Sequence, residues 1–328
     1  MQTRRTLLAT GALGAVAAPA FIRAQGASRP DKIIFATNWR AQAAHGGFYQ
    51  ALVDGTYAKA GLQVEIRQGG PQVNNRPLLP AGKIDFLMTG NLLHAFDNAK
   101  VGVPTMSVAA VFQKDPQALI AHPGQGFERF ERLKAAERFW IAKDAQFSWW
   151  QWLKREHGFK DDLLRPYNYT LGPFLANKRS VQQAYSVAEP IYVKNQGGFE
   201  PVVHLLADHG WRTPSTLIDA RADTVAQRPD LVQRFVDTST AGWRAYLGGT
   251  PEQRAAADAR MRQDNPEMNQ AELLASHALM LKQKLAGDAI GSLKLERVNA
   301  FLQDMVRAGL YKAGEVDVAK VASERFSR

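Results

Sequence analysis

Short apolar runs alternate with helix-patterned segments along the chain, and this alternation constrains the fold more than any other feature. Apolar residues after the first run recur at helical spacing, as in Phe48, Leu52 and Tyr57, and Gly61 then ends the helix as a left-handed cap. The strands predicted up to residue 115 span 33–35, 62–66, 84–88 and 105–112. The helices predicted between them cover 48–57 and 91–100, and a short one carries Leu78 and Leu79 and is broken by Gly82. Alternation of this kind predicts a parallel, doubly wound sheet.

The alternation continues with weaker edges and ends in a helical tail. The further predicted strands are 118–121, 139–142, 167–170, 184–187, 202–206 and 216–220, with a helix over 147–157. The tail helices are 231–246, 251–263, 270–284 and 293–308. We expect two α/β lobes, the first built from 26–115 plus 213–328 and the second from 116–212. Ligands of such sheets bind at the carboxyl ends of strands and at helix N-termini.

The first two dozen residues have the features of an export signal. Arg4 and Arg5 precede an apolar stretch over 7–20, and Ala18-Pro19-Ala20 supplies the small residues of a cleavage site. The paired arginines match a twin-arginine signal over 1–24, and a Sec signal that carries Arg-Arg is the alternative. The stretch is shorter than the roughly 20 residues that a membrane span needs. We expect cleavage between 20 and 26 and a periplasmic mature protein.

Composition excludes several classes of function. The chain has no cysteine, which rules out disulfides, thiolate metal sites, a Cys nucleophile and a lipid-modified N-terminal cysteine. The net charge of +10 is spread among acidic residues without a basic tract, so we expect no nucleic-acid partner. Common hydrolase, metalloprotease and nucleotide-binding motifs are absent, and the seven histidines lack metal-ligand spacing. We therefore expect no catalytic residues, no cofactor and no metal.

The segment 38–66 carries a resemblance to a known family. It reads Asn38-Trp39, then His45-Gly-Gly-Phe-Tyr-Gln-Ala51, then Gly55-Thr-Tyr57 and Gly61-Leu-Gln-Val-Glu-Ile66. This resembles the opening of periplasmic solute-binding proteins of ABC importers, in the group that handles thiamine-precursor pyrimidines, nitrate, taurine and alkanesulfonates. The segments 81–86, 103–113, 184–190, 211–215 and 228–230 are similar to later family steps. The chain departs from the family at 136–142, where a Gly-Lys-x-Val-Gly strand usually opens the second lobe.

The resemblance implies a fold and a function. It implies a type II-like periplasmic binding protein, with a mainly parallel sheet flanked by helices in each lobe and a helical C-terminal tail. The implied function is the substrate-binding component of an ABC importer, which closes about a hinge on a small aromatic or heterocyclic solute. The partner would be the cognate permease in the inner membrane, and we expect a monomer. The alternatives are a nitrate- or alkanesulfonate-binding protein, and a periplasmic enzyme on the same scaffold, since some relatives make pyrimidine.

Candidate ligand-binding residues of the first lobe follow predicted strands. Trp39 lies in the loop after the first strand, where its ring would stack on a flat ligand or pack under the loop. Asn38 and His45 flank the same loop, and His45 would donate to the ligand or cap the next helix. The other candidates stand at strand ends, where ordinary turn chemistry is the alternative explanation. They are Gly70, Asn91, Phe112 and Gln113.

The candidates of the second lobe are Phe147, Ser148, Trp149, Tyr169 and Glu189. A role as the N-cap of the next helix would by itself explain Ser148. The tryptophans at 149, 150 and 152 cannot share one helix face, so at least one should point toward the cleft or a neighbouring loop. Glu189 would suit a ligand with amino donors and would repel nitrate or a sulfonate, and N-capping is its alternative role. Together with the aromatic candidates, this acid favours a flat, nitrogen-containing or aromatic ligand.

Overall fold

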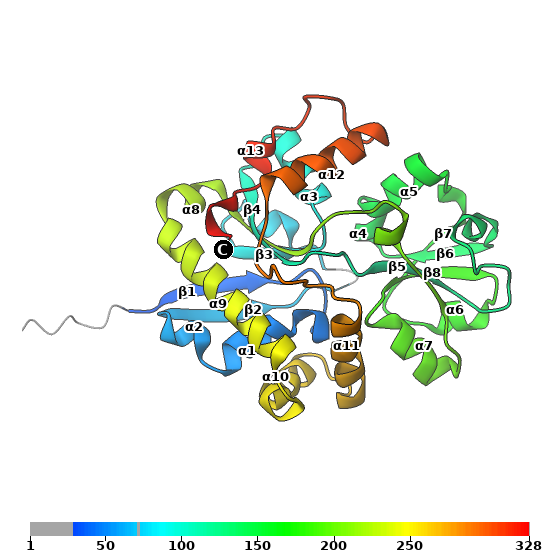
Figure 1. The fold of residues 1–328 in the computed structure, drawn as a ribbon, viewed down its shortest axis with the longest axis horizontal. Helices are drawn as coiled ribbons and strands as arrows, with labels where there is room; N and C mark the ends of the chain where they lie inside the picture. Colours follow the sequence, from blue (N-terminus) through cyan, green and yellow to red (C-terminus); the bar gives the residue numbers. More distant parts are fainter. Residues whose placement is uncertain (1–28, 71–72, 328) are drawn as a thin grey trace, which may run out of the picture.

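The computed structural model describes residues 29–70 and 73–327, and it contains two five-stranded sheets flanked by helices (Figure 1). This confirms the predicted two-lobed α/β architecture. We call the parts built on these sheets the first and second lobes. The predicted export signal lies outside the described residues, and the predicted domain boundaries stay a prediction. Within the described residues, no helix is both long enough and apolar enough to cross a bilayer.

The first sheet has the order β2-β1-β3-β10-β4. Its strands are β1 (Asp31–Ala36), β2 (Leu62–Arg67), β3 (Phe86–Thr89), β4 (Thr105–Phe112) and β10 (Ser215–Arg221). Strand β1 pairs in parallel with β2 and β3, whereas β10 runs antiparallel to β3 and β4. The helices among these strands are α1 (Gly46–Val53), α2 (Thr56–Lys59) and α3 (Leu93–Lys100). The predicted single helix over 48–57 is two helices, because Gly55 adopts a left-handed φ of 69° between them.

The second sheet has the order β7-β6-β8-β5-β9. Its strands are β5 (Gln117–Ala121), β6 (Arg138–Ile141), β7 (Leu164–Pro166), β8 (Ser180–Tyr185) and β9 (Val202–Leu205). Its helices are α4 (Lys143–Gln146), α5 (Trp149–His157), α6 (Gly172–Ala176) and α7 (Glu189–Gly197). In each sheet one strand runs antiparallel to both of its neighbours: β10 in the first sheet and β5 in the second. Each of these strands is the first one after the chain crosses from the other sheet.

Two predicted strands of the second lobe are wrong in position. The prediction at 167–170 misses β7, which ends at Pro166, and the next residues form a loop in which Tyr169 has a φ of 64°. The prediction at 184–187 covers only the end of β8, because the glutamines at 182 and 183 interrupt the apolar pattern of that strand.

The C-terminal helices cover the first lobe and reach the second. They are α8 (Ala222–Gln227), α9 (Pro229–Gly248), α10 (Pro251–Asp264), α11 (Gln270–Lys282), α12 (Leu295–Arg307) and α13 (Val318–Val321). Figure 1 shows α11 between the two sheets, beside α7. Its end is tied to the second lobe by a hydrogen bond from the Ser186 hydroxyl to Gln283 Oε1 (2.6 Å), and its start by one from the Asn195 amide to Glu272 (3.3 Å).

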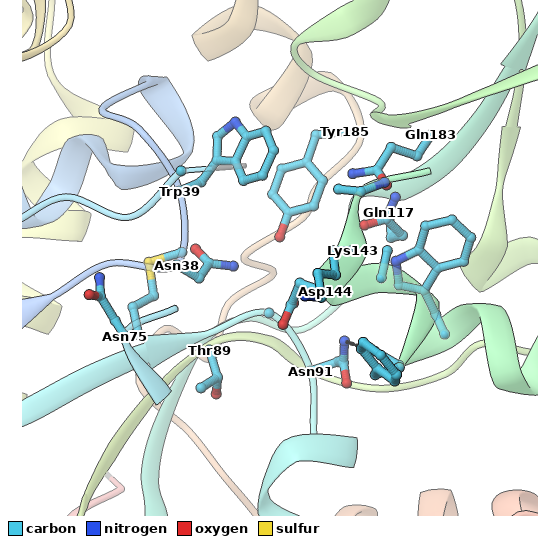
Figure 2. Close-up of a pocket in the computed structure, with 18 of the residues that line it drawn as sticks. Asn38, Trp39, Asn75, Thr89, Asn91, Gln117, Lys143, Asp144, Gln183 and Tyr185 are labelled. Atoms are coloured by element: carbon cyan, nitrogen blue, oxygen red, sulfur yellow. Dashed lines mark hydrogen bonds between the residues drawn. The ribbon is translucent and has the colours of Figure 1, made fainter. Parts of the chain in front are cut away.

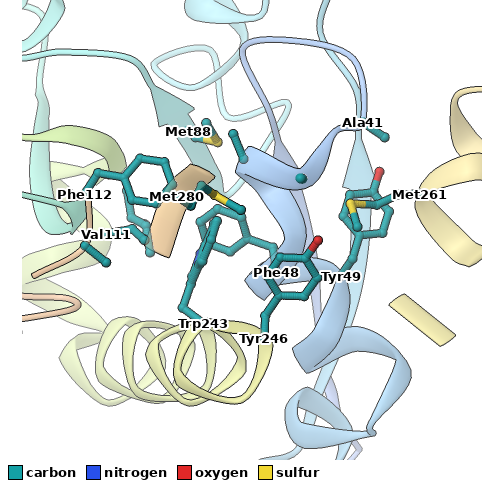
Figure 3. Close-up of a cluster of buried hydrophobic side chains, with 14 of the residues drawn as sticks. Ala41, Phe48, Tyr49, Met88, Val111, Phe112, Trp243, Tyr246, Met261 and Met280 are labelled. Carbon is teal, nitrogen blue, oxygen red and sulfur yellow. The ribbon is translucent and has the colours of Figure 1, made fainter. Parts of the chain in front are cut away.

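Helices α1 and α9 approach each other closely because glycines face the contact. A Cβ on Gly47 would lie 2.2 Å from the Trp243 ring, and a Cβ on Gly242 would lie 2.3 Å from the Gly47 carbonyl oxygen. Trp243 therefore fits against Phe48 and Phe112, with ring centroids 5.6 and 5.2 Å away (Figure 3). This packing fixes α1, and with it the loop after β1, against the sheet.

Candidate ligand-binding cleft

A cavity of about 300 Å³ lies between the two lobes. Its walls come from segments that follow the carboxyl ends of strands in both sheets, as expected for open α/β sheets. Asn38 and Trp39 follow β1, Asn91 follows β3, Asp115 follows β4 and Glu189 follows β8. The fold therefore brings together residues that lie up to 151 positions apart in the sequence, from Asn38 to Glu189.

Eight of the predicted site residues line this cavity. They are Asn38, Trp39, Gly70, Asn91, Phe147, Ser148, Trp149 and Glu189. Four others, His45, Phe112, Gln113 and Tyr169, do not line it. Ligand contact by the first group stays a prediction, since geometry alone does not test it.

His45 is a core residue and lies away from the cavity. Its ring is fully buried, and neither ring nitrogen has a hydrogen-bond partner among the described residues. Burial in these surroundings lowers the pKa of His45 to about 3, so the ring is neutral. It also makes no capping hydrogen bond at the start of α1.

Phe112 and Gln113 contact other parts of the protein and not the cavity. Phe112 ends β4 and points into the core against Trp243 (Figure 3). The Gln113 amide donates to the carbonyl oxygens of Ala289 (3.1 Å) and Ser292 (3.0 Å), and Arg297 donates to its side chain. Gln113 thus holds the first crossing between the lobes against the C-terminal segment.

Tyr169 lies behind the cavity wall, next to Trp39. The two rings meet edge to face with centroids 5.9 Å apart, and the Arg40 guanidinium lies 4.8 Å from the centre of the Tyr169 ring. Tyr167 stacks on Trp39 at 6.4 Å. Both tyrosines belong to the second lobe, so the half-buried Trp39 is supported from across the cleft.

Two buried carboxyl groups face the cavity. Glu189 is 5% exposed and accepts from the Tyr167 hydroxyl (3.1 Å) and the Tyr185 backbone N–H (2.7 Å). Asp115 is 1% exposed and accepts from the Trp211 indole N–H at 2.7 Å. Burial raises the pKa of each carboxyl to about 7. Asp115 was missed by the sequence analysis, which had no motif to mark an acid in a crossing segment.

Carboxamide side chains form much of the remaining wall. Figure 2 shows Asn38 and Asn75 on one side of the cavity and Gln117 and Gln183 on the other. The buried Asn38 Oδ1 has no hydrogen-bond partner among the described residues. Gln183 accepts from the Ala142 N–H at 2.6 Å, which orients its amide. The sequence did not indicate these glutamines, because its apolar pattern does not mark where β5 begins or where β8 runs.

Several contacts join the two lobes across the cavity. Arg76 pairs with Asp144 at 2.8 Å, and the Asn91 amide donates to the Ser148 hydroxyl oxygen at 2.9 Å. Ser148 makes no capping hydrogen bond, which corrects the expected N-cap role. Trp149 is the tryptophan of its cluster that lines the cavity. These contacts connect the two lobes across the cavity.

Charges divide unevenly along the cavity. Asp115 and Glu189 lie at its buried end, whereas the lining cations among the described residues, Arg76 and Lys143, are less buried. Arg76 is already engaged by Asp144. In the described part of the chain, no three His, Asp or Glu side chains gather in a way that could hold a metal ion.

Comparison with known proteins gives a family match over most of both lobes. A family model described as NMT1/THI5 like matches residues 42–253. A curated relative from Schizosaccharomyces pombe, a 4-amino-5-hydroxymethyl-2-methylpyrimidine phosphate synthase, is 27% identical over 104 residues. That match covers 32% of this chain, and it spans 30% of the length of the relative.

Solved structures match over nearly the whole length. The ligand-binding component of an ABC-type import system from Staphylococcus aureus is 12% identical, with a TM-score of 0.65 over 90% of this chain and 97% of that one. The periplasmic aliphatic sulphonate binding protein SsuA from Escherichia coli is 13% identical, with a TM-score of 0.64 over 89% and 91%. At these identities the likeness shows a shared fold.

Proposed function

The chain belongs to the NMT1/THI5-like family, and from this premise we propose that it is the periplasmic solute-binding component of an ABC importer. The cavity between the lobes would capture a small molecule, and the closed form would dock on a membrane permease. The observation that carries this proposal is the cavity itself, which is built at the strand ends of two sheets joined by crossing segments. Solute-binding components of import systems share this fold.

The cavity favours a planar ligand with amino groups. A buried carboxyl is costly to ionise without a partner, and an amino-bearing ligand would supply hydrogen-bond donors to Asp115 and Glu189. Trp39, supported by Tyr167, offers a flat surface for stacking. The carboxamides can donate to ring nitrogens and accept from amino groups. An aminopyrimidine combines these properties.

Nitrate and sulfonates suit the cavity less well. Anion sites concentrate hydrogen-bond donors and preferably contain an arginine. The Arg76 guanidinium is paired with Asp144, and the buried end of the cavity carries two acids. At that end a sulfonate would meet two carboxyl groups in place of the clustered donors of an anion site.

An enzyme on the same scaffold is the second candidate, and the partial match to a pyrimidine phosphate synthase is the observation that favours it. The two functions predict different fates for the ligand. A solute-binding protein returns its ligand unchanged, whereas an enzyme converts it.

The proposal is tested by calorimetry with 4-amino-5-hydroxymethyl-2-methylpyrimidine, benzoate, taurine and nitrate. We expect the pyrimidine to bind and to be recovered unchanged by mass spectrometry, with a fall in the radius of gyration at saturation. Tight binding of taurine or nitrate alone would contradict the ligand class. Conversion of the pyrimidine would favour the enzyme, and an unchanged radius would count against hinge closure.

A further inference from the structure

The less buried end of the cavity carries apolar side chains from both lobes. Phe147, in the second lobe between α4 and α5, is 64% exposed, and Val73, in the first lobe after β2, is 52% exposed. Three large hydrophobic side chains among the described residues are at least 52% exposed, and two of them line this one cavity. Single exposed apolar residues need no explanation, but these two come from opposite lobes and line the same cavity, among charged neighbours such as Arg76, Lys143 and Asp144.

Backbone hydrogen bonds hold the turns that carry the two residues. The Val73 N–H donates to the Gly70 carbonyl oxygen at 3.1 Å, and the Phe147 N–H donates to the Asp144 carbonyl oxygen at 3.2 Å. Asp144 also pairs with Arg76 from the first lobe. Both backbone segments are therefore tied to their own lobes, next to the pair that joins the lobes.

The cavity is larger than one ring requires. A cavity of roughly 150 Å³ is enough to hold benzene, whereas this cavity measures about 300 Å³. A planar head group at the end formed by Asp115 and Glu189 would leave space for a second group of similar size. Phe147 and Val73 line this same cavity, and Arg76 beside them pairs with Asp144.

We propose that Phe147 and Val73 form an outer subsite for an apolar substituent of the ligand, so that the solute is an amino-heterocycle with a second, apolar group of about ring size. This inference rests on the proposed solute-binding function and specifies its ligand. Burial of the substituent removes apolar surface of both ligand and protein from water, which stabilises the closed complex.

Two probes test the subsite: 4-amino-2-methylpyrimidine and 4-amino-5-benzyl-2-methylpyrimidine. We expect the benzyl probe to bind the full protein at least tenfold more tightly. Phe147→Ser should reduce the ratio of the two dissociation constants below threefold, and Val73→Ser should also reduce it. Val101→Ser is the matched control, because Val101 is 70% exposed and lies away from the cavity, and it should leave the ratio unchanged.

The outcomes distinguish failure of the outer subsite from failure of the proposed solute-binding function. Equal affinity for the two probes, or a ratio that Phe147→Ser leaves unchanged, would overturn the subsite while the solute-binding function stands. Failure of both probes to bind, while benzoate, taurine or nitrate binds, would overturn the amino-heterocycle and this subsite together. A Phe147→Ser protein that binds both probes like the wild type but fails to support uptake would assign the surface to the permease instead.

Discussion

At the scale of single residues, the cleft depends on how two acids are held. Glu189 is fixed by Tyr167 and by the backbone of Tyr185, while Asp115 is fixed by Trp211 from the other crossing between the lobes. Each acid thus has donors on one side and the cavity on the other. This arrangement leaves acceptor capacity for a ligand without leaving the carboxyl unpartnered in its absence.

Replacing Glu189 by Gln should weaken binding of an aminopyrimidine at least tenfold. A hydrogen bond to a charged group contributes about 1.5–3 kcal/mol, and the amide removes both the charge and one acceptor. Binding of a carboxylate ligand should not weaken. Isothermal titration of the variant with 4-amino-5-hydroxymethyl-2-methylpyrimidine and with benzoate checks both statements, and equal weakening of the two would contradict the role of the charge.

Replacing Trp39 by Ala should also weaken binding at least tenfold, which corresponds to about 1.4 kcal/mol. The variant loses the ring that Tyr167 supports and on which a flat ligand would stack. Trp39→Phe keeps an aromatic face and should restore affinity to within about threefold of the wild type by the same physical argument. If the Phe variant binds no better than the Ala variant, stacking is not the contribution of this residue.

The stability of the ligand-free protein should fall as the pH rises toward 7. The pKa values of Asp115 and Glu189 are raised to about 7, so the folded protein keeps protons that the unfolded chain releases above about pH 4. Unfolding then releases protons, and rising pH favours it until both groups are ionised. Melting temperatures at pH 5 and pH 8 should differ more in the wild type than in the Asp115→Asn, Glu189→Gln double variant. An equal difference would contradict the raised pKa values.

The sequence predicted the site where chemistry and position coincided. Trp39 and Glu189 combine an unusual residue type with a strand end, and both line the cavity. Phe112 also stands at a strand end, but nothing in the sequence indicates which face of β4 is covered by α9, and the ring packs in the core. Gln183 was not predicted because its strand, β8, lacks an apolar pattern, so the sequence did not place it near a strand end.

At the scale of elements, the predicted strands were most accurate where an apolar run is bounded by clear loop residues. The runs around β1, β2 and β4 are apolar and bounded by loop residues, and they match the structure closely. The short strands β7 and β8 contain proline, arginine and glutamines, and they form because neighbouring strands supply the pairing. Such strands depend on tertiary context, which local sequence does not contain.

The glycine contact between α1 and α9 can be tested in isolation. Gly47→Ala should destabilise the protein by about 1–3 kcal/mol or more, because the new methyl group would overlap the Trp243 ring and its backbone. Gly248→Ala, in the last turn of α9, meets no atom within 4 Å and should be neutral or slightly stabilising. Denaturant unfolding of both variants gives the comparison, and similar stabilities would contradict close packing at this contact.

At the scale of the whole molecule, the closed form is held by few contacts across the mouth. The Arg76–Asp144 pair lies at the surface, where such pairs contribute about 0–1 kcal/mol. The pair is therefore suited to adjust the balance between open and closed forms rather than to fix it. The apparent affinity changes by the same factor as the fraction of molecules in the binding-competent form.

Asp144→Asn should weaken ligand binding about two- to fivefold at low salt, as loss of a surface ion pair allows. The difference from the wild type should shrink at high salt, because salt screens the pair. Glu200→Gln is the matched control, since it removes an exposed pair with Lys194 inside the second lobe and should leave affinity unchanged. Titrations at two salt concentrations check this, and a weakening that is independent of salt would contradict an electrostatic role.

In the proposed hinge closure, helix α11 would limit the relative motions of the two lobes. The second lobe is attached to the rest of the molecule at the crossing segments, near Asp115 and Trp211, and again at α11, through Ser186 and Asn195. Two such attachments allow the second lobe to rotate about the line that joins the crossing segments to α11. Twisting or sliding of the lobe would break the contacts at one of these two places. Opening would then widen the cavity on a single side, where Arg76, Asp144 and Phe147 lie, so one route serves both entry and departure of the solute.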